Sequence, residues 1–170
     1  MKAMLLRRLG PFQRNPASLE LVEAPAPAPQ EREVLIRVSA CGVCHTELDE
    51  IEGRTPPPIL PVIPGHQVVG RVEANGPGAA RFAPGTRVGV GWIFSACGRC
   101  RYCRSGQENL CAEFRATGRD ANGGYAEYMT ANEDFAYPIP EVFSDADAAP
   151  LLCAGAIGYR SLRLTGLVNG

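Results

Sequence analysis

The feature that most constrains this chain is a cluster of four cysteines within 15 residues, at Cys97, Cys100, Cys103 and Cys111. Four thiolates at this C-x2-C-x2-C-x7-C spacing can surround one tetrahedral zinc ion. Such an ion has no open coordination position, so its expected role is structural, to pin a loop that has little apolar core of its own. A four-cysteine iron–sulfur site is the alternative that the spacing leaves open. The fold therefore has to carry a metal-binding lobe, predicted over residues 95–113.

The rest of the sequence predicts a mainly β fold. Glycine and proline account for 19 and 15 of the 170 residues, and this excess favours short strands and turns over a helix bundle. Alternating apolar residues predict a strand over residues 34–40, and short stretches bounded by turn residues predict further strands over residues 2–8, 19–22, 67–74, 86–90 and 124–131. One long helix is predicted over residues 145–164, with Ser144 as its N-cap and one face made by Ala149, Leu152, Cys153, Ala156, Ile157 and Arg160. The expected architecture is a β-barrel-like domain over residues 1–144, with a helix leaving it over residues 145–170.

Net charge and the length of the apolar stretches limit which partners and which cellular compartment we expect. The formal net charge is −1, which does not suggest a nucleic-acid surface. The apolar start of the chain is broken at once by Arg7 and Arg8, and the longest apolar stretch, residues 148–159, contains a proline and falls short of the ~20 residues that span a bilayer. We therefore expect no nucleic-acid or membrane partner and a cytoplasmic, reducing location. There, seven cysteines indicate metal binding or catalysis rather than disulfides.

A second cysteine-rich stretch, residues 41–45 (CGVCH), permits three kinds of chemistry. It fits the C-x-x-C-H pattern of c-type haem attachment and the C-x-x-C pattern of a thiol–disulfide redox centre. It could also supply one of the three protein ligands that a catalytic zinc ion needs. His66 and Cys153 are further candidate ligands elsewhere in the chain. The residues alone leave this choice open.

Several motifs taken together resemble those of the zinc-dependent alcohol dehydrogenases of the medium-chain family. The segment from Gly65 to Ala79 (GHQ-x2-G-x5-G-x2-A) resembles the family signature, and residues 44–47 (CHTE) and 149–155 (APLLCAG) resemble its first and third zinc-ligand segments. The cysteine cluster at 97–111 resembles its structural-zinc lobe, and residues 123–128 (GGYAEY) are also similar. The resemblance covers essentially the whole chain.

The resemblance implies a fold and two metal sites. The fold is a GroES-like β-barrel with a zinc-binding lobe and a C-terminal helix that would lead into a Rossmann domain. Two zinc ions are expected per chain: a catalytic ion bound by Cys44, His66 and Cys153, and a structural ion bound by the four-cysteine cluster. Cys41 matches no ligand, and the haem and redox interpretations lose their support. The implied activity is the interconversion of alcohols with aldehydes or ketones using NAD(P), with a homo-oligomer as one option for assembly.

The resemblance also assigns roles to individual residues around the catalytic zinc. Thr46 would be the first acceptor of the alcohol proton, and Glu47 would orient the imidazole of His66. The other assignments are proton exit for Asp49, cofactor contact for His45 and the substrate pocket for Trp92.

Four departures from the family pattern affect these expectations. Gln67 stands where the family usually has Glu, which removes a negative charge behind the zinc. Glu47 and Asp49 replace the usual Asp and a frequent relay histidine. The dinucleotide fingerprint G-x-G-x-x-G is absent; the nearest string, residues 76–81, lacks the last glycine and lies in a turn between predicted strands. We therefore expect these 170 residues to bind zinc with little or no turnover, and a catalytically silent zinc-binding GroES-like module that acts through partners is the alternative.

Overall fold

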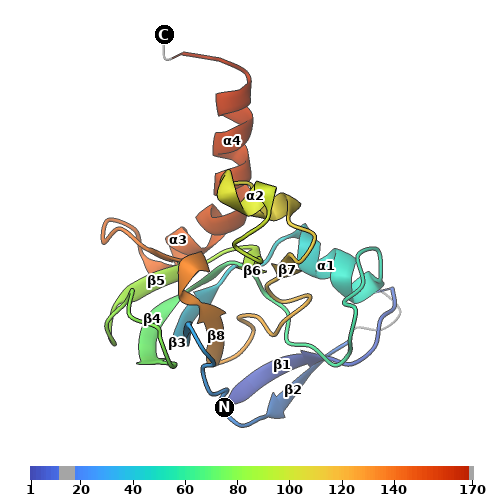
Figure 1. The fold of residues 1–170 in the computed structure, drawn as a ribbon. Helices are drawn as coiled ribbons and strands as arrows, with labels where there is room; N and C mark the ends of the chain where they lie inside the picture. The colour runs from blue at the N-terminus through green and yellow to red at the C-terminus, as the bar shows by residue number, and fades with distance from the viewer. Residues whose placement is uncertain (12–17, 169–170) are drawn as a thin grey trace.

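The structure is a computed structural model, and it describes residues 1–11 and 18–168. It is mainly β, as predicted (Figure 1). The strands are β1 (Lys2–Leu6), β2 (Leu19–Glu23), β3 (Glu33–Cys41), β4 (Val68–Asn75), β5 (Arg87–Val90), β6 (Ile93–Ser95), β7 (Arg115–Ala116), β8 (Tyr128–Asn132) and β9 (Ala136–Pro138). The helices are α1 (His45–Glu52), α2 (Arg101–Arg104), α3 (Asp145–Pro150) and α4 (Ala156–Leu164), with 3-10 turns η1 (Glu108–Leu110) and η2 (Glu133–Phe135) and a π-helical segment η3 (Leu151–Gly155).

The body of the molecule is a five-stranded antiparallel sheet in the order β8-β3-β4-β5-β9. Its long central pair, β3 and β4, contains two register shifts, and such irregularities let a sheet curl around a core. The alternation that predicted β3 holds in the structure, because Val34 and Ile36 are fully buried while Arg37 is exposed. The main core consists of Val34, Ile36, Val68, Val72, Phe82, Val88, Val90, Met129, Ala131 and Ala136.

Two small sheets complete the fold. The β1–β2 hairpin is joined to the body through bridges of Ala3 with Ala126 and of Leu6 with Val62. The β6–β7 pair lies at the base of the cysteine-rich segment that carries α2. Neither β6, β7 nor β9 was predicted from the sequence, since each has only two or three residues and is too short for a readable alternation.

The predicted strand over residues 124–131 is wrong at its start, because β8 begins only at Tyr128. The residues before it run across the backbone of Pro64 and Gly65, with hydrogen bonds from the amides of Gly124 and Tyr125 to those two carbonyls. A Cβ on Gly123 would stand 2.1 Å from the Gly65 carbonyl oxygen, so only glycine permits this approach. The segment is a backbone-to-backbone packing element rather than a strand.

The helix α1 was missed, because only residues 145–164 were predicted to be helical. It is short and begins with a sulfur cap: the Cys44 Sγ accepts from the Thr46 amide at 3.3 Å. Reciprocally, the Glu47 Oε2 accepts from the Cys44 amide at 2.8 Å, which completes a capping box. The sequence signal for the start of α1 was the pattern Cys-x-x-Glu. It was overlooked because cysteine is not among the usual capping residues.

The helix predicted over residues 145–164 is confirmed in its bounds by α3, η3 and α4, and so is its N-cap: the Ser144 Oγ accepts from the Asp147 amide. The α-helical pattern is interrupted after Pro150 by the π-helical η3, since proline lacks the amide that an α-helix interior requires. The residues of the predicted face change from buried to exposed along the helix. Ala149 is buried and Leu152 and Cys153 are half-buried, whereas Ala156, Ile157 and Arg160 are exposed.

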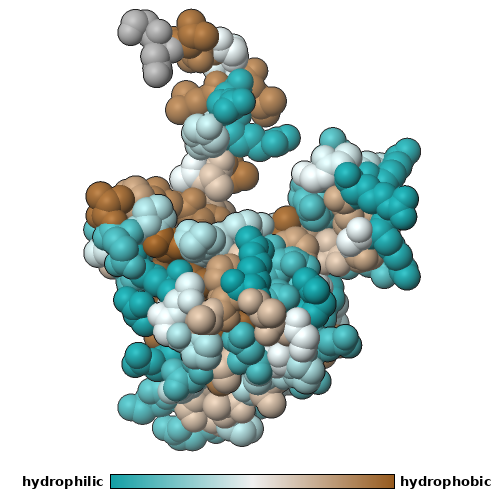
Figure 2. All heavy atoms as spheres, turned by 60° about the vertical axis from the view of Figure 1, so that its left-hand side comes forward, coloured by the Kyte–Doolittle hydropathy of each residue, from teal (hydrophilic) through white to brown (hydrophobic). Residues whose placement is uncertain are grey.

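Beyond η3, α4 projects away from the body of the molecule and carries exposed apolar side chains (Figures 1 and 2). These include Ile157, Tyr159, Leu162 and Leu164. Among the residues that the structure describes, none of the helices combines the length and apolar character needed to cross a membrane.

Candidate metal centres

The structure brings Cys44, His66 and Cys153 together. One ligand atom from each lies within 4.8 Å of the other two, and the Cys44 Sγ and the His66 Nε2 are 3.7 Å apart. A tetrahedral zinc ion, with Zn–S near ~2.3 Å and Zn–N near ~2.0 Å, would hold such a pair of ligands about 3.6 Å apart. The donor set and its spacing therefore fit one zinc ion with three protein ligands and one remaining position.

Each of these three ligands is positioned by a different element. Cys44 is the N-cap of α1, so its sulfur is fixed where the helix begins. His66 lies two residues before β4 and is 1% exposed. Cys153 sits in the middle of η3, and burial raises the pKa of its thiol to about 11. Binding of a divalent cation would lower this pKa again, because the ion stabilises the thiolate form.

A buried carboxylate lies behind the histidine. The Glu47 Oε1 is 2.5 Å from the His66 Nδ1, and the two side chains are 2% and 1% exposed. Burial raises the pKa of the Glu47 carboxyl, but its hydrogen bond to His66 and the charge of that ring outweigh burial, so the net shift is downward. A carboxylate on Nδ1 fixes the tautomer in which Nε2 is free to bind a metal.

Trp92 and Thr46 lie beside the same cluster. The Trp92 ring meets the His66 ring edge to face, with centroids 5.0 Å apart and an interplanar angle of 81°. Trp92 also contacts Phe114, with centroids 6.4 Å apart. Thr46 is half-buried in the first turn of α1, two residues after Cys44. Both residues are thus placed next to the ligands.

Asp49 and His45 lie on the outer side of α1. The Asp49 Oδ1 accepts from Arg54 at 2.5 Å and is 3.9 Å from the His45 Nε2. The His45 side chain is 78% exposed. In the described part of the chain, the ion-pair partners of Asp49 are these two residues and not the three cluster ligands, so any part it plays in proton transfer would be at the solvent edge.

The four-cysteine cluster also closes. The Cys103 Sγ is 3.9 Å from that of Cys97 and 3.6 Å from that of Cys100, and Cys111 completes the group within 4.8 Å. These are the edge lengths of a sulfur tetrahedron around one ion, about 3.8 Å for zinc. An iron–sulfur cluster of several irons would spread the thiolates further apart, so the geometry favours a single ion. Hydrogen bonds from the Arg99 and Cys100 amides lower the pKa of Cys97 to about 6, which prepares one thiolate.

Residues 30–141 match the family described as the alcohol dehydrogenase GroES-like domain. The chain belongs to this family. A probable alcohol dehydrogenase of Mycobacterium tuberculosis, AdhA, is 49% identical over all of this chain and 50% of its own length. An alcohol dehydrogenase of Geobacillus stearothermophilus is 46% identical over 89% of this chain and 45% of its own length. A crystal structure of an NAD-dependent alcohol dehydrogenase superposes with a TM-score of 0.82 at 34% identity, over 89% of this chain and 43% of that one.

The resemblance to the zinc-dependent medium-chain alcohol dehydrogenases is thereby confirmed, as is the mainly β, GroES-like fold. The chain spans about half the length of the curated relatives it matches.

One residue that supports the GroES-like metal centre was missed by sequence reasoning. Arg87 is 7% exposed, and its guanidinium donates to the Asp145 carboxylate at 2.7 Å, the Phe143 carbonyl at 2.8 Å and the Pro140 carbonyl at 3.0 Å. These bonds tie the segment before α3 to β5. Because η3 follows α3 directly, Arg87 fixes the route along which Cys153 reaches the cluster. An arginine within an apolar strand was the only signal in the sequence.

Cys41 stays outside both clusters of this GroES-like domain. Its half-buried thiol packs near Gly65 and Gly124, and burial raises its pKa to about 12. A thiol that resists ionisation in this way is a poor nucleophile.

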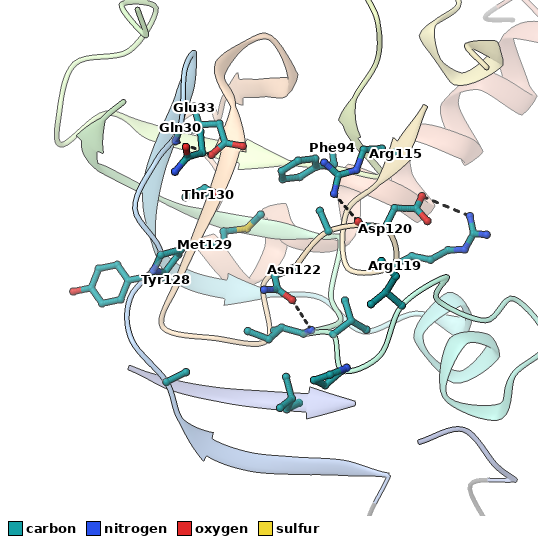
Figure 3. Close-up of a pocket in the computed structure, with 18 of the residues that line it drawn as sticks. Gln30, Glu33, Phe94, Arg115, Arg119, Asp120, Asn122, Tyr128, Met129 and Thr130 are labelled. Atoms are coloured by element: carbon teal, nitrogen blue, oxygen red, sulfur yellow. Dashed lines mark hydrogen bonds and ion pairs between the residues drawn. The ribbon is translucent and has the colours of Figure 1, made fainter. Parts of the chain in front are cut away.

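A cavity of about 660 Å³ lies elsewhere in the domain (Figure 3). Phe94, Arg115, Arg119 and Asp120 line its wall, and of the described residues around it none is a ligand of either cysteine cluster. In Figure 3 the Arg115 guanidinium donates to the Asp120 carbonyl and Arg119 pairs with the Asp120 carboxylate. Its polar groups are thus engaged with one another, so the centre of Cys44, His66 and Cys153 remains the better candidate for catalysis.

Proposed function

We propose that this chain carries the catalytic domain of a zinc-dependent oxidoreductase that interconverts alcohols with aldehydes or ketones. The observation that supports this most is the convergence of Cys44, His66 and Cys153 from three separate elements into one three-ligand centre. Two thiolates and one neutral imidazole balance the charge of Zn²⁺ and leave a coordination position open. When bound, zinc would supply a Lewis acid that polarises the substrate oxygen and favours loss of its proton.

The residues of the chain have distinct roles in this proposal. Glu47 holds the His66 ring through Nδ1 and keeps Nε2 directed at the metal position. The Trp92 ring, packed edge-on against His66, forms a wall of the substrate pocket. The Thr46 hydroxyl is the first acceptor of the alcohol proton, which leaves to solvent at the exposed edge of α1 where Asp49 lies.

The cofactor in this proposal is NAD(P), which would accept the hydride. The support is family-level: an NAD-dependent alcohol dehydrogenase shares the fold at 34% identity. Exposed His45 at the start of α1 is proposed to contact the cofactor. The chain itself has no G-x-G-x-x-G at a strand-to-helix turn, so the cofactor domain is proposed to belong to a longer protein, as in relatives of about twice this length.

The domain assignment follows the same reasoning. Residues 1–144, including the lobe at 95–113, are proposed to form the catalytic domain with a structural zinc. Residues 145–170 are proposed to connect it to a nucleotide-binding domain, which would cover the exposed apolar side chains of α4. A small alcohol or aldehyde is the proposed substrate, in the cytoplasm, with assembly into a homo-oligomer as one option.

Metal content tests the two sites. We expect two zinc ions per chain by elemental analysis, one fewer in Cys44→Ala and one fewer in Cys111→Ala. Unchanged zinc in Cys44→Ala would refute the three-ligand centre. A longer protein that contains this domain is expected to reduce NAD⁺ or NADP⁺ with a simple alcohol and to lose that activity in Cys44→Ala. The 170 residues alone are expected to bind zinc with little or no turnover, and zinc binding without activity in the longer protein would favour a silent zinc-binding module.

A further inference from the structure

Glu50 is a buried acid behind the Glu47–His66 pair. It follows Glu47 by three residues on α1, so the two carboxyl groups share one face of the helix. The Glu50 side chain is 1% exposed, and neither of its carboxyl oxygens has a hydrogen-bond partner among the described residues. Buried polar groups nearly always have such partners. A carboxyl group held here without one suggests a role other than stabilising the fold.

Arg119 supplies the opposing charge. It lies between β7 and β8, its side chain is 34% exposed, and its Nε is buried without a hydrogen-bond partner. Its guanidinium pairs with the Asp120 carboxylate at 3.7 Å, and Figure 3 marks this ion pair with a dashed line. The positive charge of Arg119 acts on Glu50 and favours its ionised form. Glu50 is therefore held between a negative neighbour, Glu47, and a positive one.

The balance of these neighbours favours a neutral Glu50 at neutral pH. Burial raises its pKa to about 8, the Glu47 charge adds to this effect, and the Arg119 charge opposes it. The charged and titratable groups facing it are Glu47 and Asp49 on its own helix, and Arg119, Asp120 and Tyr125 between β7 and β8. The Tyr125 hydroxyl is also buried without a partner, and burial raises its pKa. A neutral Glu50 therefore adds no charge to that of the Glu47 carboxylate three residues before it on α1.

We infer that Glu50 is a positioning residue for the three-ligand metal centre, acting through Glu47 and opposed by Arg119. In its neutral form it leaves Glu47 as the one negative charge behind His66. In its ionised form it adds a second negative charge behind His66, which strengthens the attraction of the centre for a divalent cation. The inference rests on the proposed function only in taking Cys44, His66 and Cys153 as zinc ligands.

The test compares zinc affinity at two pH values in wild type, Glu50→Gln and Glu52→Gln. Glutamine keeps the shape of the side chain but cannot ionise. Glu52→Gln is the matched control, because it makes the same change on the same helix at a residue paired with Arg54. Affinity is measured by competition with a chromophoric chelator at about pH 6.5 and about pH 9, on either side of the Glu50 transition. The signal that persists in Cys44→Ala belongs to the four-cysteine cluster and is subtracted.

We expect Glu50→Gln to match wild type near pH 6.5 and to bind zinc about tenfold more weakly near pH 9, in the lower range of effects from residues that support a metal ligand. Glu52→Gln should match wild type at both values. An equal wild-type-to-variant ratio at the two pH values would overturn the inference. If circular dichroism shows that Glu50→Gln does not fold, Arg119→Met replaces it. Loss of the Arg119 charge should move the rise in zinc affinity, which accompanies ionisation of Glu50, to higher pH than in wild type. A rise at the wild-type pH would equally overturn the inference. The zinc content of Cys44→Ala tests the three-ligand centre separately from Glu50. If this variant binds one zinc fewer, the proposed centre stands even where the inference about Glu50 fails.

Discussion

Replacing Gly123 by alanine should destabilise the domain next to its metal centre. An added Cβ would stand 2.1 Å from the Gly65 carbonyl oxygen, 2.8 Å from the Gly118 Cα and 2.9 Å from the Pro64 carbonyl oxygen. All three are backbone atoms, so no side chain can rotate away to make room. The loop between β7 and β8 would have to move off the residues that precede His66.

The cost can be worked from the bonds that this movement breaks. The amides of Gly123, Gly124 and Tyr125 donate to the carbonyls of Ile63, Gly65 and Pro64 at 2.7, 2.9 and 3.0 Å. At about 1 kcal/mol for each net hydrogen bond, their loss comes to about 3 kcal/mol. Alanine also restricts the unfolded chain, which returns about 0.4–1 kcal/mol. The expected net loss in the free energy of unfolding is therefore about 2 kcal/mol.

Gly158→Ala is the matched control. Gly158 lies within α4 and an added Cβ meets nothing within 4 Å, so alanine should stabilise that helix by up to about 1 kcal/mol. Urea unfolding of the zinc-loaded chain is followed by circular dichroism and by the fluorescence of Trp92, the single tryptophan. If Gly123→Ala unfolded at the same urea concentration as wild type, the close packing of this loop on Gly65 would be refuted.

Three further changes test the support of the metal centre. Glu47→Gln should weaken zinc binding at the three-ligand site by about tenfold to a hundredfold, because the His66 tautomer loses its anionic partner; chelator competition measures this, and an unchanged affinity would contradict it. Arg87→Met should lower the free energy of unfolding by about 3 kcal/mol through loss of three hydrogen bonds, as measured in urea; a wild-type midpoint would show that the bonds do not matter. The free energy of unfolding of the zinc-free chain should fall by a few kcal/mol as pH rises from about 5 to about 8, because folded Glu50, with its pKa raised to about 8, keeps a proton that the unfolded chain releases; Glu50→Gln should flatten this slope, and an unaltered slope would count against a buried, neutral carboxyl group.

The parts of the fold that the sequence predicted are those fixed by local patterns. The apolar residues that alternate in β3 and run together at the start of β4 gave nearly the observed bounds, because these side chains are buried in the core. The four cysteines of the lobe lie within 15 residues, so spacing alone indicated that they could meet. The helix α1 was missed because its signal is a sulfur cap, and the interruption at η3 was missed because a proline in a predicted helix does not reveal which irregular turn follows it.

The three-ligand centre required more than local patterns. His66 and Cys153 are separated along the chain by most of the sheet, and only the resemblance to a known family connected them before the structure did. No periodicity could have indicated that Arg87 ties down the segment before α3, or that the charge of Arg119 acts on Glu50, since both effects join segments that are distant in the sequence.

The two metal centres therefore depend on the rest of the fold in different ways. The lobe is organised by neighbours in sequence, so its metal and its local fold should be gained and lost together. The three-ligand centre is held by a helix cap at Cys44, by the backbone packed on Gly65 beside His66, and by the segment tied to Arg87 before Cys153. Each of these supports belongs to the fold as a whole. A perturbation anywhere in the sheet should therefore reach the three-ligand centre before it reaches the lobe, and zinc lost first on mild denaturation should be the zinc that Cys44 binds.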